Sequence, residues 1–259
     1  HAKMLLVTRR EKGRLRRYAH LSTGNYNPGT ARLYTDISHL TADEALTADM
    51  DQIFLHLASQ NRLPRLHKAL IAPFHLHQAM TEQVEAAAAA ARAGKEARIV
   101  LKMNALTDEP LARCLAEASQ AGVQIDLIIR GACILPAGLP GVTDHVRVRS
   151  VIGRLLEHSR VFYFRIDGAE SLWLSSADWM NRNMLRRVEL AWPVTDAALR
   201  QRIIDECLLA YLHDTKDAWL LQPDGRYLPA AATAAAAGKA RTPQHSAQNH
   251  LMARYGSRG

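Results

Sequence analysis

Two short patterns in this sequence place a histidine and a cation two residues apart. The first is His1-Ala-Lys3, followed about twenty residues later by the stretch Thr23-Gly24-Asn25. The second is His158-Ser-Arg160, followed at a similar distance by Ser176-Ala177-Asp178. Because residues i and i+2 of a strand point to the same face, each pattern would present an imidazole and a cation side by side.

This grouping of side chains suits chemistry at phosphorus. An imidazole can attack a phosphoryl group, and cations can hold the phosphate oxygens. Two copies of the pattern indicate two half-sites that face one another, one supplying a nucleophile and the other a helper. A strand-end histidine exposed to solvent is the simpler interpretation of either copy alone, so the repetition is what favours a site.

Further basic and aromatic side chains could complete such a site. Arg130 ends an apolar stretch before Gly131, where it could meet an anion, although an ordinary surface arginine fits equally well. Tyr34 could stack on a base or donate a hydrogen bond, but a tyrosine there also fits a hydrophobic core. Arginine forks match phosphate oxygens in two-point contacts, and acids are sparse around an arginine cluster after Asp178. That cluster consists of Arg182, Arg186 and Arg187.

The elements that must position these residues follow an alternating order. Residues 4–7 and 15–20 are expected strands joined by a charged turn, and residues 42–57 are weakly helical. From residue 75 onward helices and strands alternate, which is typical of an α/β layer fold. We expect Thr107 to cap the second helix of this series. The expected helices of the series span residues 75–93, 107–121 and 195–211, and the expected strands span 97–102, 124–129, 146–151, 161–165 and 171–174.

Composition and charge exclude several classes of protein. The 259 residues are 48% hydrophobic and contain no stretch near the roughly 18 apolar residues of a membrane span. The sequence has no Gly-x-x-x-x-Gly-Lys loop and no cysteine or histidine set with metal-ligand spacing. The net charge of +8 is unevenly distributed. Residues 1–36 contain eight Lys or Arg and two acids, and residues 226–259 contain five Lys or Arg and no acid. This imbalance indicates a polyanion partner or a solvated basic face.

Several segments, in order along the chain, resemble one known family. They are HAKMLLVTRRE, RRYAHLSTGNYNPGTARLYTD, ARIVLKMNALTD, AGVQIDLIIRGACIL, VIGRLLEHSRVFYF, SSADWMNRNMLRRVEL and DGRYLP. Together they are similar to the C-terminal half of bacterial polyphosphate kinase, of the type that synthesises long chains. The resemblance runs from His1 to about Leu228.

The resemblance implies a fold within the α/β class made of phospholipase D-like domains, the first truncated at its N-terminal side and the second complete. Residues 1–70 would be the remainder of the first catalytic domain, and residues 71–228 the second. Residues 229–259 form a basic, Ala-rich tail without apolar periodicity, which we expect to be disordered. We interpret the sequence as a C-terminal fragment and expect it to be inactive alone.

The resemblance also implies an activity, the reversible transfer of the ATP γ-phosphate to inorganic polyphosphate through a phosphohistidine. By position, His1 corresponds to the phosphorylated histidine and His158 to the second active-site histidine. Tyr34, Arg130 and His158 match the family's nucleotide-binding positions. A metaphosphate-like transition state needs its charge spread over cations. Besides Arg130, the cations that we expect to contribute are Lys3, Arg160, Arg186 and Arg187.

The cofactor and partners follow from the same resemblance. Mg²⁺ is expected to accompany ATP, with any protein ligands upstream of residue 1, so no metal ligand is predicted within the chain. The expected partners are ATP or ADP and inorganic polyphosphate, without nucleic acid, in a homo-oligomer. A cytoplasmic location is expected, and membrane association is left open.

Two other functions stay open at this point. A phospholipase D-type phosphodiesterase would use the same paired histidines with water or an alcohol as acceptor, but that class usually carries His-x-Lys in both copies, and Arg160 departs from this. A non-catalytic module would bind polyphosphate or nucleic acid with a steep salt dependence. The sequence also departs from the polyphosphate kinase pattern at Pro136-Ala137, where Arg-Pro is usual, which leaves that loop's role in chain binding open.

Overall fold

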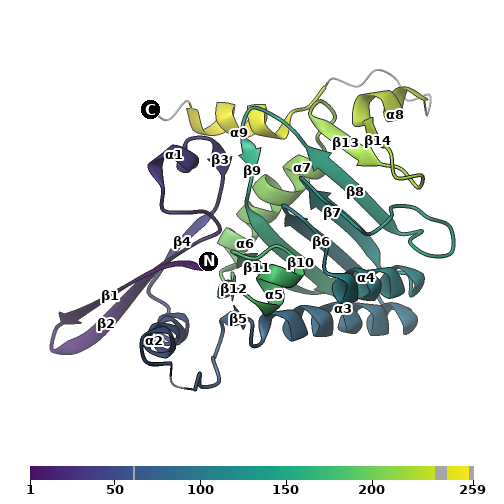
Figure 1. The fold of residues 1–259 in the computed structure, drawn as a ribbon. Helices are drawn as coiled ribbons and strands as arrows, with labels where there is room; N and C mark the ends of the chain where they lie inside the picture. Colours follow the sequence, from purple (N-terminus) through teal and green to yellow (C-terminus); the bar gives the residue numbers. More distant parts are fainter. Residues whose placement is uncertain (61, 237–243, 257–259) are drawn as a thin grey trace.

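The structure is a computed structural model that describes residues 1–60, 62–236 and 244–256 (Figure 1). Helices and strands are mixed along the chain, which confirms the expected α/β class. A nine-stranded sheet forms the centre. Its strands are β5 (Leu70–Ala72), β6 (Ala97–Met103), β7 (Gln124–Ile129), β8 (Val146–Val151), β10 (Arg160–Ile166), β11 (Ala169–Ser175), β12 (Glu189–Pro193), β13 (Ala218–Leu221) and β14 (Tyr227–Pro229).

The central sheet combines a parallel middle with antiparallel flanks. The strand order is β14-β13-β8-β7-β6-β10-β11-β12-β5, in which β6, β7 and β8 pair in parallel and the other neighbours pair antiparallel. Both faces are buried along β6 and β7, so these two strands are mostly apolar, whereas β8 alternates apolar and polar residues. In β6, Ile99 and Leu101 belong to one core and Val100 to the core on the other face.

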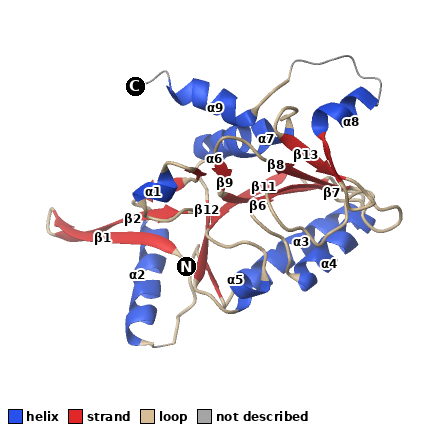
Figure 2. Cartoon of the chain, turned by 45° about the horizontal axis from the view of Figure 1, so that its top comes forward, coloured by secondary structure: helices blue, strands red, loops and turns tan. Residues whose placement is uncertain are grey.

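Helices cover both faces of this sheet (Figure 2). Helices α3 (Leu76–Arg92) and α4 (Glu109–Gln120) pack on one face. The opposite face is covered by α6 (Ala197–Ile203), a π-helical turn η1 (Ile204–Leu209) and α7 (Ala210–Leu212). The result is a three-layer arrangement in which the sheet separates two hydrophobic cores.

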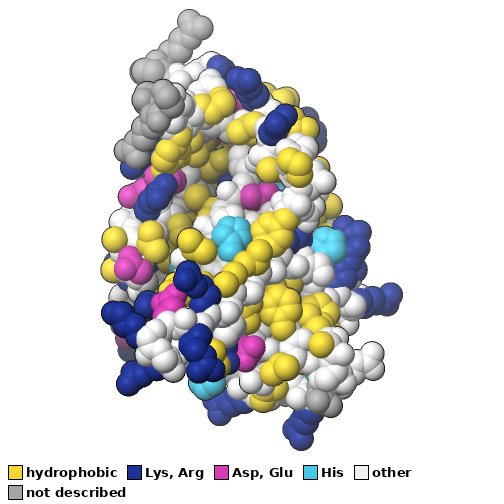
Figure 3. Space-filling view, turned by 90° about the vertical axis from the view of Figure 1, so that its left-hand side faces the viewer, with side chains coloured by type: hydrophobic (Ala, Val, Ile, Leu, Met, Phe, Trp, Pro, Cys, Tyr) yellow, Lys and Arg dark blue, Asp and Glu magenta, His cyan; other side chains and the backbone are white. Residues whose placement is uncertain are grey.

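The N-terminal segment forms a separate, three-stranded antiparallel sheet. Its β1–β2 hairpin projects from the body of the molecule (Figure 1) and carries exposed Leu5, Val7 and Leu15. On the face seen from the hairpin's side, hydrophobic side chains lie among Lys and Arg (Figure 3). The elements of this segment are β1 (Lys3–Glu11), β2 (Arg14–Ser22), α1 (Pro28–Ala31), β3 (Tyr34–Thr35), β4 (Ser38–Thr41) and α2 (Glu44–Ser59), and β3 pairs in parallel with β9 (Leu156–Glu157).

Two details of the predicted helices differ from the structure. Helix α4 is capped by Asp108, whose carboxylate accepts a hydrogen bond from the Leu111 N–H, so the predicted cap at Thr107 is wrong by one residue. The backbone N–H groups of Thr107 and Asp108 both donate to the carbonyl of Trp179, which fixes the chain before the helix starts. The helix expected over 195–211 begins at Ala197 and is interrupted by η1.

The C-terminal segment contains two helices among its described residues, so the expectation of disorder does not hold there. Helix α8 spans Ala230–Ala236 and helix α9 spans Ala247–Gly256. The start of helix α9 is held by the buried polar side chains of Ser246 and Gln248 as well as by Ala247, which is buried in the core, and a search for apolar periodicity misses such a helix. The parts of the expected disordered tail at 237–243 and 257–259 lie outside the described residues.

Candidate active site

The two histidines of the repeated pattern lie at one cavity. His1 precedes β1 and His158 precedes β10, so each imidazole sits where a strand begins. The cavity has a volume of about 370 Å³. A larger cavity, of about 630 Å³, borders Tyr34–Asp36 from another side but has neither histidine in its lining. Side chains that line the smaller cavity include His1, Tyr34, Asn104, Arg130, His158, Arg160, Asp178, Arg182, Asn183 and Arg187.

His1 is held between a buried carboxylate and two cations. Its Nδ1 lies 3.4 Å from Glu189 Oε1 and 3.2 Å from Lys3 Nζ, and its Nε2 lies 3.3 Å from Arg187 Nη1. Nδ1 thus lies between an acceptor, the Glu189 carboxylate, and a donor, the Lys3 ammonium group, while Nε2 lies beside Arg187. Burial lowers the pKa of Lys3, and the nearby Glu189 carboxylate opposes that shift. Nε2 is the ring nitrogen of His1 that lies on the Arg187 side.

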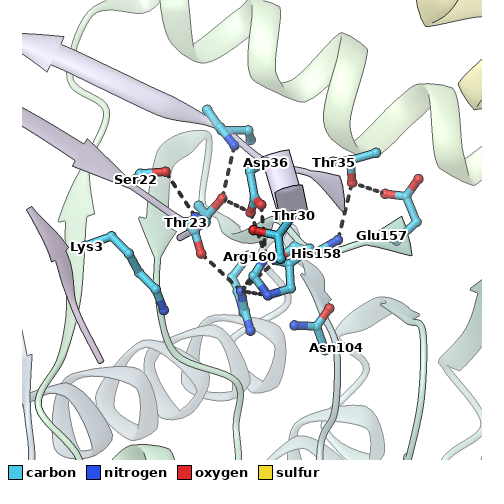
Figure 4. Close-up of polar contacts among 12 residues, drawn as sticks. Lys3, Ser22, Thr23, Thr30, Thr35, Asp36, Asn104, Glu157, His158 and Arg160 are labelled. Carbon is cyan, nitrogen blue, oxygen red and sulfur yellow. Dashed lines mark hydrogen bonds and ion pairs between the residues drawn. The ribbon is translucent and has the colours of Figure 1, made fainter. Parts of the chain in front are cut away.

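His158 is held in a similar way by a carboxylate from the N-terminal segment (Figure 4). Its Nδ1 lies 2.9 Å from Asp36 Oδ1 and 3.0 Å from Oδ2. The Asp36 carboxylate also accepts a hydrogen bond of 2.7 Å from the Thr23 hydroxyl. The Tyr34 ring packs against the imidazole, with the ring centroids 4.9 Å apart. His158 therefore directs Nε2 away from the carboxylate.

The two histidine–carboxylate pairs cross between the two parts of the chain. His1 contacts Glu189, which accepts from the Ser176 hydroxyl, and His158 contacts Asp36, which accepts from the Thr23 hydroxyl. In both cases the acid follows the hydroxyl residue by 13 positions. Sequence reasoning missed both acids, although this equal spacing after the two small-residue stretches was a signal that could have found them.

Arg160 is a buried structural partner as well as a lining residue. Its Nε and Nη2 donate to the two oxygens of Asp178, at 3.2 and 3.0 Å, and its Nη1 donates to the carbonyls of Thr23 and His158. Burial disfavours ionisation of Asp178, but attraction to Arg160 outweighs it and lowers the pKa of the carboxyl group. Every nitrogen of the Arg160 guanidinium thus already has a protein partner, which joins the N-terminal segment to the sheet.

The remaining predicted cations divide between the cavity and its surroundings. Arg130 follows β7, donates from Nε to the carbonyl of Glu157 at 2.7 Å, and lines the cavity. Arg187 also lines it, whereas Lys3 does not line it and reaches His1 from beside it. Arg186 follows α5 (Asn181–Leu185), is exposed, and is not among the lining residues. Arg182, on α5, takes a place in the lining instead.

Acids are more frequent here than the sequence suggested. Asp36, Asp178 and Glu189 all lie at or behind the cavity, so the expectation of sparse acids is wrong; Asp36 comes from a position distant from the arginine cluster, whereas Asp178 and Glu189 flank the cluster in sequence. Each carboxylate is already engaged by a histidine, lysine or arginine.

Among the described residues, no group of three or more His, Cys, Asp or Glu is placed to hold a metal ion, so this donor set does not fit Mg²⁺. In the described ranges no helix is long and apolar enough to cross a membrane.

Comparison with known proteins identifies the family of this chain. Residues 1–63 match the family model described as polyphosphate kinase C-terminal domain 1, and residues 69–241 match the model described as domain 2. The polyphosphate kinase of Pseudomonas aeruginosa is 53% identical over 227 residues, which cover 88% of this chain and 33% of that protein. The polyphosphate kinase of Neisseria meningitidis serogroup B is 49% identical over 231 residues, which cover 89% of this chain and 34% of that protein.

A solved structure supports the same assignment. The crystal structure of polyphosphate kinase from Porphyromonas gingivalis matches with a TM-score of 0.89 at 33% identity, covering 99% of this chain and 39% of that one. The chain spans about a third of the length of the curated relatives that it matches. By sequence and by structure, the chain belongs to the polyphosphate kinase family.

Proposed function

We propose that this chain carries part of the catalytic site of a polyphosphate kinase that transfers the ATP γ-phosphate reversibly to inorganic polyphosphate. The observation that supports it most is the convergence of His1 and His158 on one cavity together with Arg130 and Arg187. Family membership supplies the substrate class, ATP and polyphosphate, which a site of nucleophile and cations suits. The site lies between two parts of the chain, so it needs both of them.

In the first step, His1 Nε2 attacks the γ-phosphorus in line with the leaving ADP. The N–P bond forms as the bond between the γ-phosphorus and the bridging oxygen breaks, and the product is a phosphohistidine. Glu189 holds the Nδ1 proton, which orients the ring and stabilises the positive charge that develops on it. The loose transition state places negative charge on the equatorial oxygens, where Arg187 and Arg130 lie within the cavity to receive it.

In the second step, a terminal phosphate oxygen of the polyphosphate chain attacks the phosphohistidine. The new P–O bond forms as the N–P bond breaks, which regenerates neutral His1 and lengthens the chain by one phosphate. His158, held at Nδ1 by Asp36, acts in the first step, where its imidazolium form donates from Nε2 to a phosphate oxygen of the departing ADP. Mg²⁺ accompanies ATP in this proposal, and no step is assigned to ligands of this chain.

The decisive experiment is labelling of the full-length enzyme with ATP carrying ³²P at the γ-position. We expect acid-labile, base-stable label in the wild type and none in His1→Gln. The matched control is His20→Gln, because the His20 ring contacts Tyr26 and does not line the cavity. Label that survives in His1→Gln would overturn the assignment of the nucleophile.

The paired histidines would serve a phosphodiesterase equally well, but the products of the two reactions distinguish them. A phosphodiesterase would transfer the phosphoryl part of a phosphodiester to water or an alcohol and would not build polymer from ATP.

We further propose that the 259 residues are inactive alone, since the relatives are about three times as long. Robust ATP-dependent polymer synthesis by these residues would contradict that proposal.

A further inference from the structure

The start of helix α9 reaches the segment that presents His158. Gln248, the second residue of α9, is 2% exposed. Its Nε2 donates to the Leu155 carbonyl at 2.8 Å and to Glu157 Oε1 at 2.6 Å, and its Oε1 accepts from the Leu155 N–H at 2.8 Å. One side-chain amide thus uses both amide protons and its oxygen on a three-residue stretch just before His158.

The chain opposite Gln248 has room for it only because a glycine stands there. A Cβ added at Gly153 would lie 2.5 Å from Gln248 Oε1 and 2.8 Å from its Cδ. Such distances are well inside van der Waals contact, so alanine at 153 would push the amide away from Leu155. Gly153 therefore offers a way to disturb Gln248 without altering it.

Helix α9 is itself fixed to the body of the molecule. The Ala247 N–H donates to Asp214 Oδ2 at 2.7 Å, and the His245 N–H donates to the Thr215 hydroxyl at 2.9 Å. The Ser246 hydroxyl donates to the carboxylate of Asp217. These three contacts tie the start of α9 to the loop that precedes β13, so the backbone that carries Gln248 is fixed in place.

Glu157, the acceptor of Gln248, connects several elements. Its side chain is 4% exposed, and its Oε2 lies 2.7 Å from Lys102 Nζ and 2.8 Å from the Thr35 hydroxyl. Lys102 also lies 3.4 Å from the centroid of the Tyr211 ring. Because an ion pair removed from water needs all its hydrogen bonds, the Gln248 amide completes the surroundings of this buried carboxylate.

The contacts of Glu157 lead directly to the second histidine (Figure 4). The Thr35 hydroxyl that donates to Glu157 accepts from the His158 N–H at 3.3 Å. The residue after Thr35 is Asp36, which accepts from His158 Nδ1. The position of the Glu157 carboxylate therefore affects both ends of the His158–Asp36 pair.

We propose that Gln248 is a positioning residue that fixes Leu155–Glu157, and through them the His158–Asp36 pair at the cavity. The residue touches neither histidine and acts through the backbone and Glu157. Its effect on catalysis rests on the proposed phosphotransfer function, but its effect on the structure of the 155–158 segment does not.

The first test compares Gln248→Ala with Asn249→Ala in the full-length enzyme. Asn249 is the exposed neighbour on the same helix, which makes it a matched control. In single-turnover labelling, we expect Gln248→Ala to lower the rate constant of phosphohistidine formation about 10- to 100-fold, as misplacement of a catalytic group by about 1 Å does. The final amount of label should stay the same, whereas partial unfolding would lower the amount and leave the rate constant unchanged.

The second test is a double-mutant cycle with Gly153→Ala. The added methyl should slow labelling in the wild type by displacing the Gln248 amide, and should add nothing in Gln248→Ala, where that amide is absent. Fully additive effects of the two substitutions would overturn the proposal, as would a labelling rate constant in Gln248→Ala equal to that of the wild type.

Amide hydrogen exchange supplies a measurement that needs no activity. We expect the peptide that contains Leu155 to exchange faster in Gln248→Ala, while peptides from β6 stay unchanged. Unchanged exchange at Leu155 would overturn the inference whatever the enzyme does. If Leu155 exchanges faster in Gln248→Ala but the wild type forms no phosphohistidine, the positioning role is supported and only the proposed function is rejected.

Discussion

The imidazoles of His1 and His158 each direct Nδ1 toward a carboxylate that belongs to the opposite part of the chain. A carboxylate at Nδ1 fixes the tautomer and the orientation of the ring, and it stabilises the charge that appears when Nε2 forms a bond. The two acids are themselves held by the hydroxyls of Thr23 and Ser176. In the proposed reaction, single residues that do not touch the phosphorus should therefore affect the rate.

Glu189→Gln tests this control at the nucleophile. The amide preserves the shape of the side chain but removes the charge that, in the proposed reaction, orients the His1 ring and stabilises it as the N–P bond forms. We expect the rate of phosphohistidine formation to fall by a factor of about 100 or more, by analogy with other histidines that lose an orienting carboxylate. Glu109→Gln, which alters an exposed pair with Arg113, is the control in the same labelling assay. A rate in Glu189→Gln close to that of the wild type would show that the carboxylate is dispensable.

At the scale of elements, the sequence predicted the helices and strands that carry apolar patterns and missed what depends on contacts between elements. The strands β6, β7 and β8 were predicted nearly to the residue, because β6 and β7 are mostly apolar and β8 alternates apolar and polar residues. Helix α9 was missed because polar contacts hold its start, and such contacts leave no periodic signal. The cap of α4 was misplaced because Thr107 and Asp108 are both good capping residues, and only the contact of the chain with Trp179 decides between them.

The corrected cap leads to a comparison of neighbouring substitutions. Asp108 accepts hydrogen bonds from the Leu111 N–H at 3.1 Å and from His77 Nε2 at 3.0 Å, and its side chain is buried. Asp108→Ala should lower the free energy of unfolding by about 1–2 kcal/mol. Thr107→Ala should change it by less than about 0.5 kcal/mol, since no cap is lost. Urea unfolding of both variants measures the difference, and equal losses would mean that the cap is shared.

At the scale of the whole molecule, buried ion pairs hold the N-terminal segment, the sheet and α9 together. Among the described residues, both side chains are buried in the pair of Arg160 with Asp178 and in that of Lys102 with Glu157. Burial opposes ionisation of both acids, but attraction to the partner cations outweighs it and lowers the pKa of each. Removing one member of such a pair leaves a buried charge without compensation, which destabilises strongly.

The lowered pKa values predict how stability depends on pH. An acid whose pKa is lowered by folding stabilises the folded state fully above its ordinary value, here 3.8 for Asp and 4.5 for Glu, and the stabilisation is lost as the pH falls further. Asp178→Asn should cost about 3 kcal/mol near pH 7, and its difference from the wild type should shrink below about pH 4. Urea unfolding across pH checks this, with the exposed Asp205→Asn as control. A constant difference across pH would contradict it.

The sequence by itself determined the α/β class, the family resemblance and the paired histidines, because apolar runs, turn residues and short motifs are local in the chain. Only the tertiary structure decided which carboxylate each histidine contacts, that Arg160 is neutralised by Asp178, and that Gln248 contacts the segment before His158. These partners lie far apart in sequence, so their pairing depends on how the N-terminal segment and α9 pack against the ends of the strands. That packing follows from burial and hydrogen bonding over the whole chain, which no short pattern contains.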